Sequence, residues 1–198
     1  MKRITSKKDR EKRQKLNQFI IGGVLIFIMF ASVFGIIVNS FGEEDSELKK
    51  INYNGFEFMN QNDFWILELE GFQFIFKNNP EQIELNESIN ISSEINSLNS
   101  YLGKPLYVFS EDNNAKWEIY KNLDPRANRI VQRMQDACFE EECGENLPNK
   151  TCENNFIIIK ESNNSRIIQE DNCVFIEGKK ENLIKLTDKY LFKMLGVE

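Results

Sequence analysis

Four cysteines are the residues of this chain whose type and spacing best predict a chemistry. With four, eight and twenty residues between neighbours, they are Cys138, Cys143, Cys152 and Cys173. An even number of cysteines favours disulfides outside the cytoplasm, whereas the same set in the cytoplasm would suggest a four-thiolate zinc site. The spacing lacks the Cys-x2-Cys pairs that are usual in zinc ribbons and thiol oxidoreductases. The side of the membrane on which the cysteines lie therefore decides between the two interpretations.

Catalytic groups are hard to find in this sequence. The chain contains no histidine, which excludes Ser-His and Cys-His nucleophilic sites. It also contains no Gly-rich phosphate loop, metal-binding triad or nucleophile elbow. Two carboxylates could still act together as acid and base, but with 31 Asp and Glu residues no pair can be nominated. We therefore predict no catalytic residue, no metal site and no cofactor, and keep a hydrolase with paired carboxylates as an alternative.

Four Asn-x-Ser/Thr sequences match the acceptor pattern of N-glycosylation. Their asparagines are Asn86, Asn90, Asn149 and Asn163. Some matches are expected by chance in a chain so rich in Asn, so the pattern predicts accessible positions and leaves their occupancy open. All four follow the apolar stretch described next, which agrees with a domain outside the cytoplasm.

The chain is organised around an uncharged stretch from Phe19 to Val38. As a helix this stretch would be about 30 Å long, close to the hydrocarbon thickness of a bilayer. We therefore predict a transmembrane signal anchor over residues 19–40, preceded by a basic arm over 1–18 and followed by a charged spacer over 41–50. A cleaved signal peptide is the alternative, but its apolar region usually covers about 7 to 15 residues. The uninterrupted length favours an anchor that stays attached to the domain over 51–198.

Charge on the two sides of the apolar stretch predicts the orientation of the chain. The first fifteen residues carry eight Lys or Arg against two acidic residues, a net charge of +6. The rest of the chain carries −12, because the whole chain carries −6. Basic residues beside a membrane helix stay in the cytoplasm. We therefore expect a single-pass protein of the cell membrane with a cytoplasmic N-terminus and an extracytoplasmic C-terminal domain, in which the cysteines form disulfides.

The domain over residues 51–198 is predicted to be α+β, with a mainly antiparallel or mixed sheet and helices packed on it. Its clearest element is a hairpin from Phe64–Leu69 to Phe72–Lys77. The two-residue turn Glu70-Gly71 would place six large apolar side chains on one face of this hairpin. Tyr53–Met59 is predicted to form one strand before it, because apolar and polar residues alternate there.

Periodic apolar residues predict the remaining elements. A buried strand is expected over residues 106–109, and helices are expected over 92–102, 113–122, 127–138 and 181–195. Three strands over 156–160, 166–169 and 173–177 suggest a meander. Such an up-down-up path returns Cys152 and Cys173 to the same end of the sheet. The favoured disulfides are therefore Cys152 with Cys173 and Cys138 with Cys143.

Three runs of sequence, 151–161, 172–178 and 186–196, resemble small single-pass membrane proteins of unknown function from archaea. The likeness extends to the basic arm, the apolar stretch and the start of the domain at Tyr53-Asn54-Gly55. The resemblance implies a prokaryotic cell envelope, and it implies no activity.

Together these features predict a membrane-anchored extracytoplasmic domain that binds or scaffolds another protein, as an accessory subunit of an envelope assembly. Its expected partners are the lipid bilayer, through residues 19–40, and a protein of the envelope. Ala31 and Gly35 have the spacing of small residues that lets two helices approach closely, so a homodimer is a further candidate. No nucleic-acid partner is expected. A cytoplasmic-facing zinc domain with four cysteine ligands is the second alternative to the binding function, after the hydrolase.

Overall fold

The structure is a computed structural model that describes residues 18–30, 32, 49–83, 89–92, 94–124, 126, 130–139 and 146–198. The chain forms two compact units, Met1–Glu47 and Leu48–Glu198. In the first unit, residues 18–30 are helical. Over the described part of the chain, no helix combines the length and the apolar character that crossing a membrane requires. Ala31, Gly35 and Val38 lie outside the described residues, as do residues 1–17 of the basic arm and most of the spacer.

The second unit begins with a four-stranded antiparallel sheet in the order β1-β2-β3-β4. Its strands are β1 (Lys50–Tyr53), β2 (Phe56–Gln61), β3 (Phe64–Leu69) and β4 (Phe72–Phe76). The predicted hairpin is confirmed, because Leu69 lies opposite Phe72 and Leu67 lies opposite Phe74. Trp65, Leu67, Phe74 and Phe76 share the buried face of this sheet.

Three two-residue turns explain why this sheet is so regular. The turn residues Asn54-Gly55, Asn62-Asp63 and Glu70-Gly71 all have positive φ. Two successive residues with positive φ define the turn whose twist matches that of a hairpin, and Asn-Gly is its strongest sequence signal. The single strand predicted over Tyr53–Met59 is therefore wrong, because Asn54-Gly55 divides it into β1 and β2.

A six-stranded mixed sheet forms the other side of the unit, in the order β5-β11-β12-β10-β6-β7. Its strands are β5 (Asn90–Ile91), β6 (Pro105–Ser110), β7 (Arg133–Asp136), β10 (Phe156–Glu161), β11 (Arg166–Glu170) and β12 (Cys173–Gly178). Strands β7, β6, β10 and β12 run parallel, and β11 is antiparallel to β12. Two short strands, β8 (Cys138–Phe139) and β9 (Asn149–Lys150), make a small third sheet.

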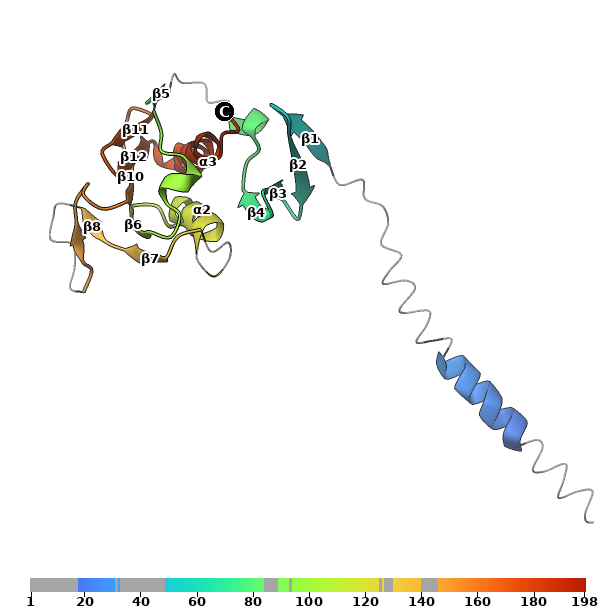
Figure 1. Cartoon of the computed structure of the whole chain (residues 1–198). Coiled ribbons are helices and arrows are strands. Elements are labelled where there is room, and N and C mark those ends of the chain that lie inside the picture. Colours follow the sequence, from blue (N-terminus) through green and yellow to red (C-terminus); the bar gives the residue numbers. More distant parts are fainter. Residues whose placement is uncertain are drawn as a thin grey trace, which may run out of the picture. The chain divides into compact units, whose positions relative to one another are not determined.

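Helices α2 (Asn113–Leu123) and α3 (Leu183–Met194) form a layer between the two large sheets (Figure 1). The Asp112 carboxylate caps α2 by accepting a hydrogen bond of 2.8 Å from the backbone N–H of Ala115. Single turns of 3-10 helix cover Pro80–Ile83 (η1), Leu98–Ser100 (η2) and Lys180–Asn182 (η3). The described unit therefore has three layers, sheet on helices on sheet.

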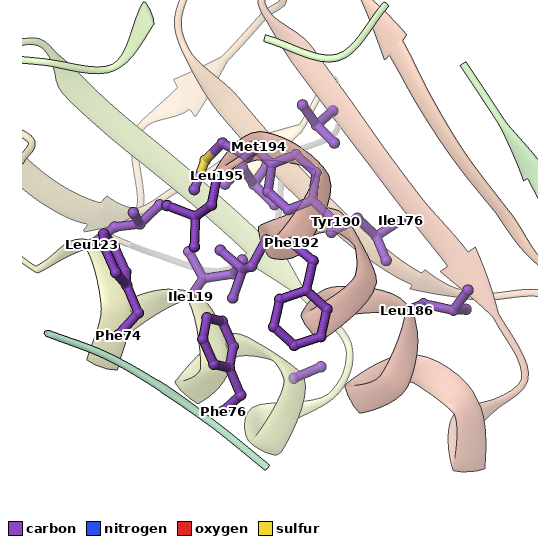
Figure 2. Close-up of a cluster of buried hydrophobic side chains, with 14 of the residues drawn as sticks. Phe74, Phe76, Ile119, Leu123, Ile176, Leu186, Tyr190, Phe192, Met194 and Leu195 are labelled. Atoms are coloured by element: carbon purple, nitrogen blue, oxygen red, sulfur yellow. The ribbon is translucent and has the colours of Figure 1, made fainter. Parts of the chain in front are cut away.

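One hydrophobic core joins all three layers. Phe74 and Phe76 of β4 point toward the helices in Figure 2. The ring centre of Phe192 on α3 lies 4.5 Å from that of Phe76 and 5.5 Å from that of Phe58. On the side of α3 that faces the mixed sheet, Leu186 packs against β12. Helix α3 is therefore buried on two sides, although its sequence shows the apolar stripe of a helix that covers one sheet.

The α-helix predicted over residues 92–102 is wrong. The backbone N–H of Ser92 donates to the carbonyl of Ile167 at 2.9 Å, and the backbone N–H of Asn96 donates to the side chain of Gln169 at 3.4 Å. Strand β5 pairs with β11 just before these bonds, and η2 is the helical turn that the described residues retain. Hydrogen bonding to the sheet edge thus overrides the helical spacing.

The helix predicted over residues 127–138 is also wrong for the part that the structure describes. Arg133 lies opposite Pro105 at the start of β7, which extends the sheet beside β6. Ile130 and Val131 are buried, but they lie in the segment just before strand β7 and not in a helix. Residues 127–129 lie outside the described residues.

The predicted meander has its three strands in the wrong order. Strands β10, β11 and β12 form, but β12 lies between β10 and β11 and runs parallel to β10. Cys173, Val174 and Ile176 are all buried, so β12 has apolar residues for both of its faces. Strand β11 carries exposed Arg166 and Glu170 and suits a place nearer the edge.

Candidate functional site

The Cys152–Cys173 disulfide is present, with the two Cα atoms 4.9 Å apart. Cys152 precedes β10 and Cys173 opens β12, and because these strands are parallel both residues lie at the same end of the mixed sheet. The predicted pairing of Cys152 with Cys173 is therefore confirmed, although the predicted strand order is wrong. Cys138 is buried and also takes part in a disulfide. Cys143, its predicted partner, lies outside the described residues.

Three of the four glycosylation candidates fall on described residues. Asn90 lies in β5, Asn149 in β9 and Asn163 in the turn between β10 and β11. All three side chains are exposed, which a glycan on the asparagine requires. Asn86 lies outside the described residues. Occupancy of these positions stays a prediction.

A polar cavity opens beside the disulfide, and we call it the Tyr107 cavity. Its volume is about 290 Å³, and its walls come from Lys104, Pro105, Tyr107, Glu153, Asn154, Asn155 and Asn172. Tyr107 is the third residue of β6, and the other residues lie at or just before the first residues of the parallel strands β6, β10 and β12. Residues far apart in the sequence therefore meet at one edge of the mixed sheet.

Two cations contact the tyrosine of this cavity. Nη2 of Arg133 donates a hydrogen bond of 3.0 Å to the hydroxyl of Tyr107. Nζ of Lys150 lies 4.6 Å from the centre of the Tyr107 ring. Burial opposes ionisation of Tyr107, but hydrogen bonds and positive charge from Arg133 and Lys150 outweigh it and lower the pKa of its hydroxyl. The side chain of Tyr107 is thus held in an electropositive environment.

The amide side chains of the Tyr107 cavity are fixed by the backbone around the disulfide. Nδ2 of Asn172 donates to the carbonyl oxygens of Cys152 at 3.2 Å and Glu153 at 3.4 Å. Nδ2 of Asn155 donates to the carbonyl oxygen of Pro105 at 3.4 Å. The disulfide and these bonds connect three strands at the rim, so the wall of the cavity is built before any ligand arrives.

A second, smaller cavity of about 180 Å³ lies between α2 and β7, lined by Asn113, Lys116, Trp117, Tyr120 and Asp136. The Asp136 carboxylate accepts hydrogen bonds from Nζ of Lys116 at 3.0 Å and from the hydroxyl of Tyr120 at 2.7 Å. Burial and the charge of Asp136 raise the pKa of Tyr120. The polar groups of this cavity are therefore largely satisfied by one another, and Trp117, which is 63% exposed, is its main open surface.

Two carboxyl groups do meet in the structure, inside the helix layer. Glu118 of α2 is 4% exposed and Asp188 of α3 is 0% exposed. Burial first, and then the charge and hydrogen bond of Glu118, raise the pKa of Asp188 well above its ordinary value. The Asp188 carboxyl group is therefore easier to protonate in the folded chain than in water. Nζ of Lys121 lies 2.6 Å from Oε2 of Glu118, with which it forms an ion pair.

Buried amides complete this polar cluster and join the layers. The backbone N–H and the side-chain amide of Asn78 each donate a 2.9 Å hydrogen bond to Oδ2 of Asp188. The side chain of Asn122 accepts from the backbone N–H of Ile75 at 2.7 Å and donates to its carbonyl at 2.8 Å. The pair of carboxyl groups thus lies under β4 and its following turn, where a substrate has no access. The burial of Glu118 and Asp188 does not fit a hydrolase that uses this pair of carboxylates.

The sequence did not point to these sites. Glu118 and Asp188 lie on otherwise apolar helix faces, and a carboxyl group at such a position is a sequence signal for a buried polar site. Lys104, Tyr107, Arg133 and Lys150 give no such signal, because only the order of the strands brings them together. Among the described residues, no group of three or more His, Cys, Asp or Glu side chains could hold a metal ion. The disulfide also removes Cys152 and Cys173 from any thiolate site in this structure.

No family model, no curated protein and no solved structure matches this chain. The fold and the two cavities are therefore the basis for any inference about function. The resemblance to archaeal membrane proteins stays a prediction.

Proposed function

We propose that this chain is a membrane-anchored binding protein whose domain over residues 51–198 holds a ligand outside the cytoplasm. The observation that carries the anchor is the exposed surface of the helix over residues 18–30. Ten large apolar side chains on this helix are at least 52% exposed, from Phe19 at 82% to Phe30 at 64%. Exposed apolar surface on this scale marks a site of contact with a membrane or another protein.

A lipid bilayer fits this surface better than a single protein groove. Residues 24–30 are all exposed, and at 3.6 residues per turn they point in every direction around the helix. A helix that is apolar all round belongs inside a bilayer or a large core. The sequence continues without a charge to Val38, which gives the length of one bilayer. Burying ten such side chains at about 1.5 kcal/mol or more each would favour the lipid by at least roughly 15 kcal/mol.

Two features support an extracytoplasmic location for the domain. Disulfides persist in oxidising compartments, and Cys152 is bonded to Cys173. The basic N-terminal arm independently favours the orientation that leaves the domain outside. The archaeal resemblance would place the protein in a prokaryotic envelope, as an accessory subunit of an assembly there.

The described cavities favour binding over catalysis. The Tyr107 cavity offers amides, a hydroxyl and the ammonium group of Lys104, which position a ligand, and its one carboxylate is that of Glu153. The two carboxyl groups that do meet are buried in the helix layer. A ligand would therefore find groups that recognise it at the rim of the mixed sheet, whereas the acid-base pair lies out of its reach.

The anchor is tested with the full chain expressed in cells. We expect it to stay in the membrane pellet after washing with alkaline carbonate, and an added protease should digest the domain in intact cells stripped of their wall. The double variant Ile28→Arg/Met29→Arg should be released, since each Arg at the centre of a span costs about 2.5–3.5 kcal/mol. The variant Ile28→Leu/Met29→Leu is the control and should pellet like the unchanged chain. Release of the unchanged chain by carbonate, or digestion only after lysis, would contradict the proposal.

A further inference from the structure

We infer that the Tyr107 cavity binds an oxyanion, a carboxylate or a phosphate group carried by a small molecule. The inference rests on the proposed binding function and names the chemical class of the ligand. One cation, Lys104, lies in the wall of the cavity, and two more, Arg133 and Lys150, contact the wall residue Tyr107. The charges of Lys104 and Glu153 balance within the wall, so the excess of positive charge comes from Arg133 and Lys150.

Within the part of the chain that the structure describes, these three cations differ from cations such as Arg166, whose Nε lies 2.7 Å from a carboxylate oxygen of Glu177. None of the ion pairs between described residues involves Lys104, Arg133 or Lys150. Three cations near a single carboxylate, that of Glu153, leave an excess of positive charge in a chain of net charge −6, and this excess attracts an anion from outside.

The hydroxyl of Tyr107 adds a donor that is already oriented. Its oxygen accepts a hydrogen bond from Arg133, so its own proton is left to donate to another acceptor. Arg133 and Lys150 make this proton more acidic, and hydrogen bonds to ionised acceptors are shorter and stronger than neutral ones. An oxyanion in the cavity would therefore receive bonds from a hydroxyl and from at least one cation.

The size and the remaining walls favour a small organic anion over a bare ion. The cavity of about 290 Å³ is several times the space of one water, about 30 Å³ in the liquid. Asn154, Asn155 and Asn172 add amide groups that could orient the polar body of the ligand. The cations at the rim repel metal ions, so a cation is a poor occupant of this site. Carboxylates and phosphates are both oxyanions, and the experiment below determines which of the two classes binds.

Binding is measured by titration calorimetry on the full chain in detergent, with succinate and inorganic phosphate as probes and glycerol as the uncharged control. We expect at least one anion to bind and glycerol not to bind. The variant Arg133→Gln/Lys150→Gln should weaken that binding at least tenfold, and Tyr107→Phe should weaken it about fivefold. The control Lys180→Gln, at the start of η3, should leave it unchanged. Circular dichroism confirms that each variant is folded.

Each outcome has a definite meaning. Binding of succinate alone identifies a carboxylate ligand, and binding of phosphate alone identifies a phosphate ligand. The inference is overturned if neither anion binds, or if either binds equally well to the Arg133→Gln/Lys150→Gln variant. The carbonate wash and protease assays are run on the same preparations. If those succeed while the anions fail to bind, the anchored extracytoplasmic domain stands and only the anion site is refuted.

Discussion

Replacing Asp188 by Asn tests whether a protonated carboxyl group lies in the helix layer. Asn has the same shape as protonated Asp and can donate to Glu118 in the same way. Its carbonyl oxygen can accept the two bonds that Asn78 now gives to Oδ2 of Asp188. The substitution therefore keeps the contacts and removes the ability of this position to ionise.

The expected magnitude follows from proton linkage. In the unfolded chain the pKa of Asp188 is about 3.9, and in the folded chain burial and Glu118 hold its pKa well above that. Between these two values the folded protein binds one more proton than the unfolded chain. The free energy of unfolding therefore falls by about 1.4 kcal/mol for each pH unit as the pH rises. This contribution is complete below pH 4 and is lost as the pH rises through the folded pKa, and Asp188→Asn abolishes that dependence.

Urea unfolding followed by the fluorescence of Trp65, which is buried, measures this effect between pH 4 and pH 7.5. The variant and the unchanged domain should have similar stability near pH 4. Above it, the variant should gain about 1.4 kcal/mol per pH unit over the unchanged domain until the folded pKa is reached. Glu94→Gln, at an exposed carboxyl group, should run parallel to the unchanged domain at every pH. Parallel profiles for Asp188→Asn would refute the protonated pair.

Two further substitutions test how the layers are joined. Asn122→Ala leaves the backbone N–H and carbonyl of Ile75 without their partner, and we expect a loss of about 2–3 kcal/mol in the free energy of unfolding by urea; a loss below 0.5 kcal/mol would mean that these bonds do not stabilise the fold. The double variant Cys152→Ser/Cys173→Ser opens a loop of 21 residues, and we expect a loss of about 3 kcal/mol, measured as a lower midpoint of thermal unfolding; an unchanged midpoint would contradict a structural role for the bridge.

The local elements of the first sheet could be predicted because their signals lie close together in the sequence. Glu70-Gly71 between two apolar runs was sufficient to give the register of β3 and β4. Asn54-Gly55 is a signal of the same kind, but the alternating pattern around it predicts one strand where the structure has a hairpin. Turn residues are thus sufficient to predict strand pairing when the two strands follow one another directly in the sequence.

The mixed sheet could be predicted only in part, because its neighbours are distant in sequence. The apolar runs predict each of the strands β6, β10, β11 and β12, but no feature within a run predicts that β12 lies between β10 and β11. The segments beside Ile91 and Arg133 have helical spacing and form edge strands, since hydrogen bonds to the sheet outweigh intrinsic preference. The Tyr107 cavity is a product of that order, which is why no pattern in the sequence predicts it.

The disulfide shows how a wrong arrangement can still give a correct pair. The prediction needed only that the chain reverse twice between Cys152 and Cys173. Both the expected meander and the observed order meet that condition, because β11 is antiparallel to β12 while β10 is parallel to it. The number of chain reversals between two cysteines can thus be predicted from the sequence even where the order of the strands in the sheet cannot.

The place of α3 between two sheets has a consequence for how the domain is made. The first sheet is complete at Phe76, but its apolar face is covered by α2 and by Phe192 of α3, which both follow it in the chain. During synthesis, this face would therefore stay uncovered until α2 emerges, and the rings of Phe58 and Phe76 would wait for Phe192. A chain that stops before residue 183 would keep the contacts of α2 with both sheets but would lack the ring that packs on Phe58 and Phe76.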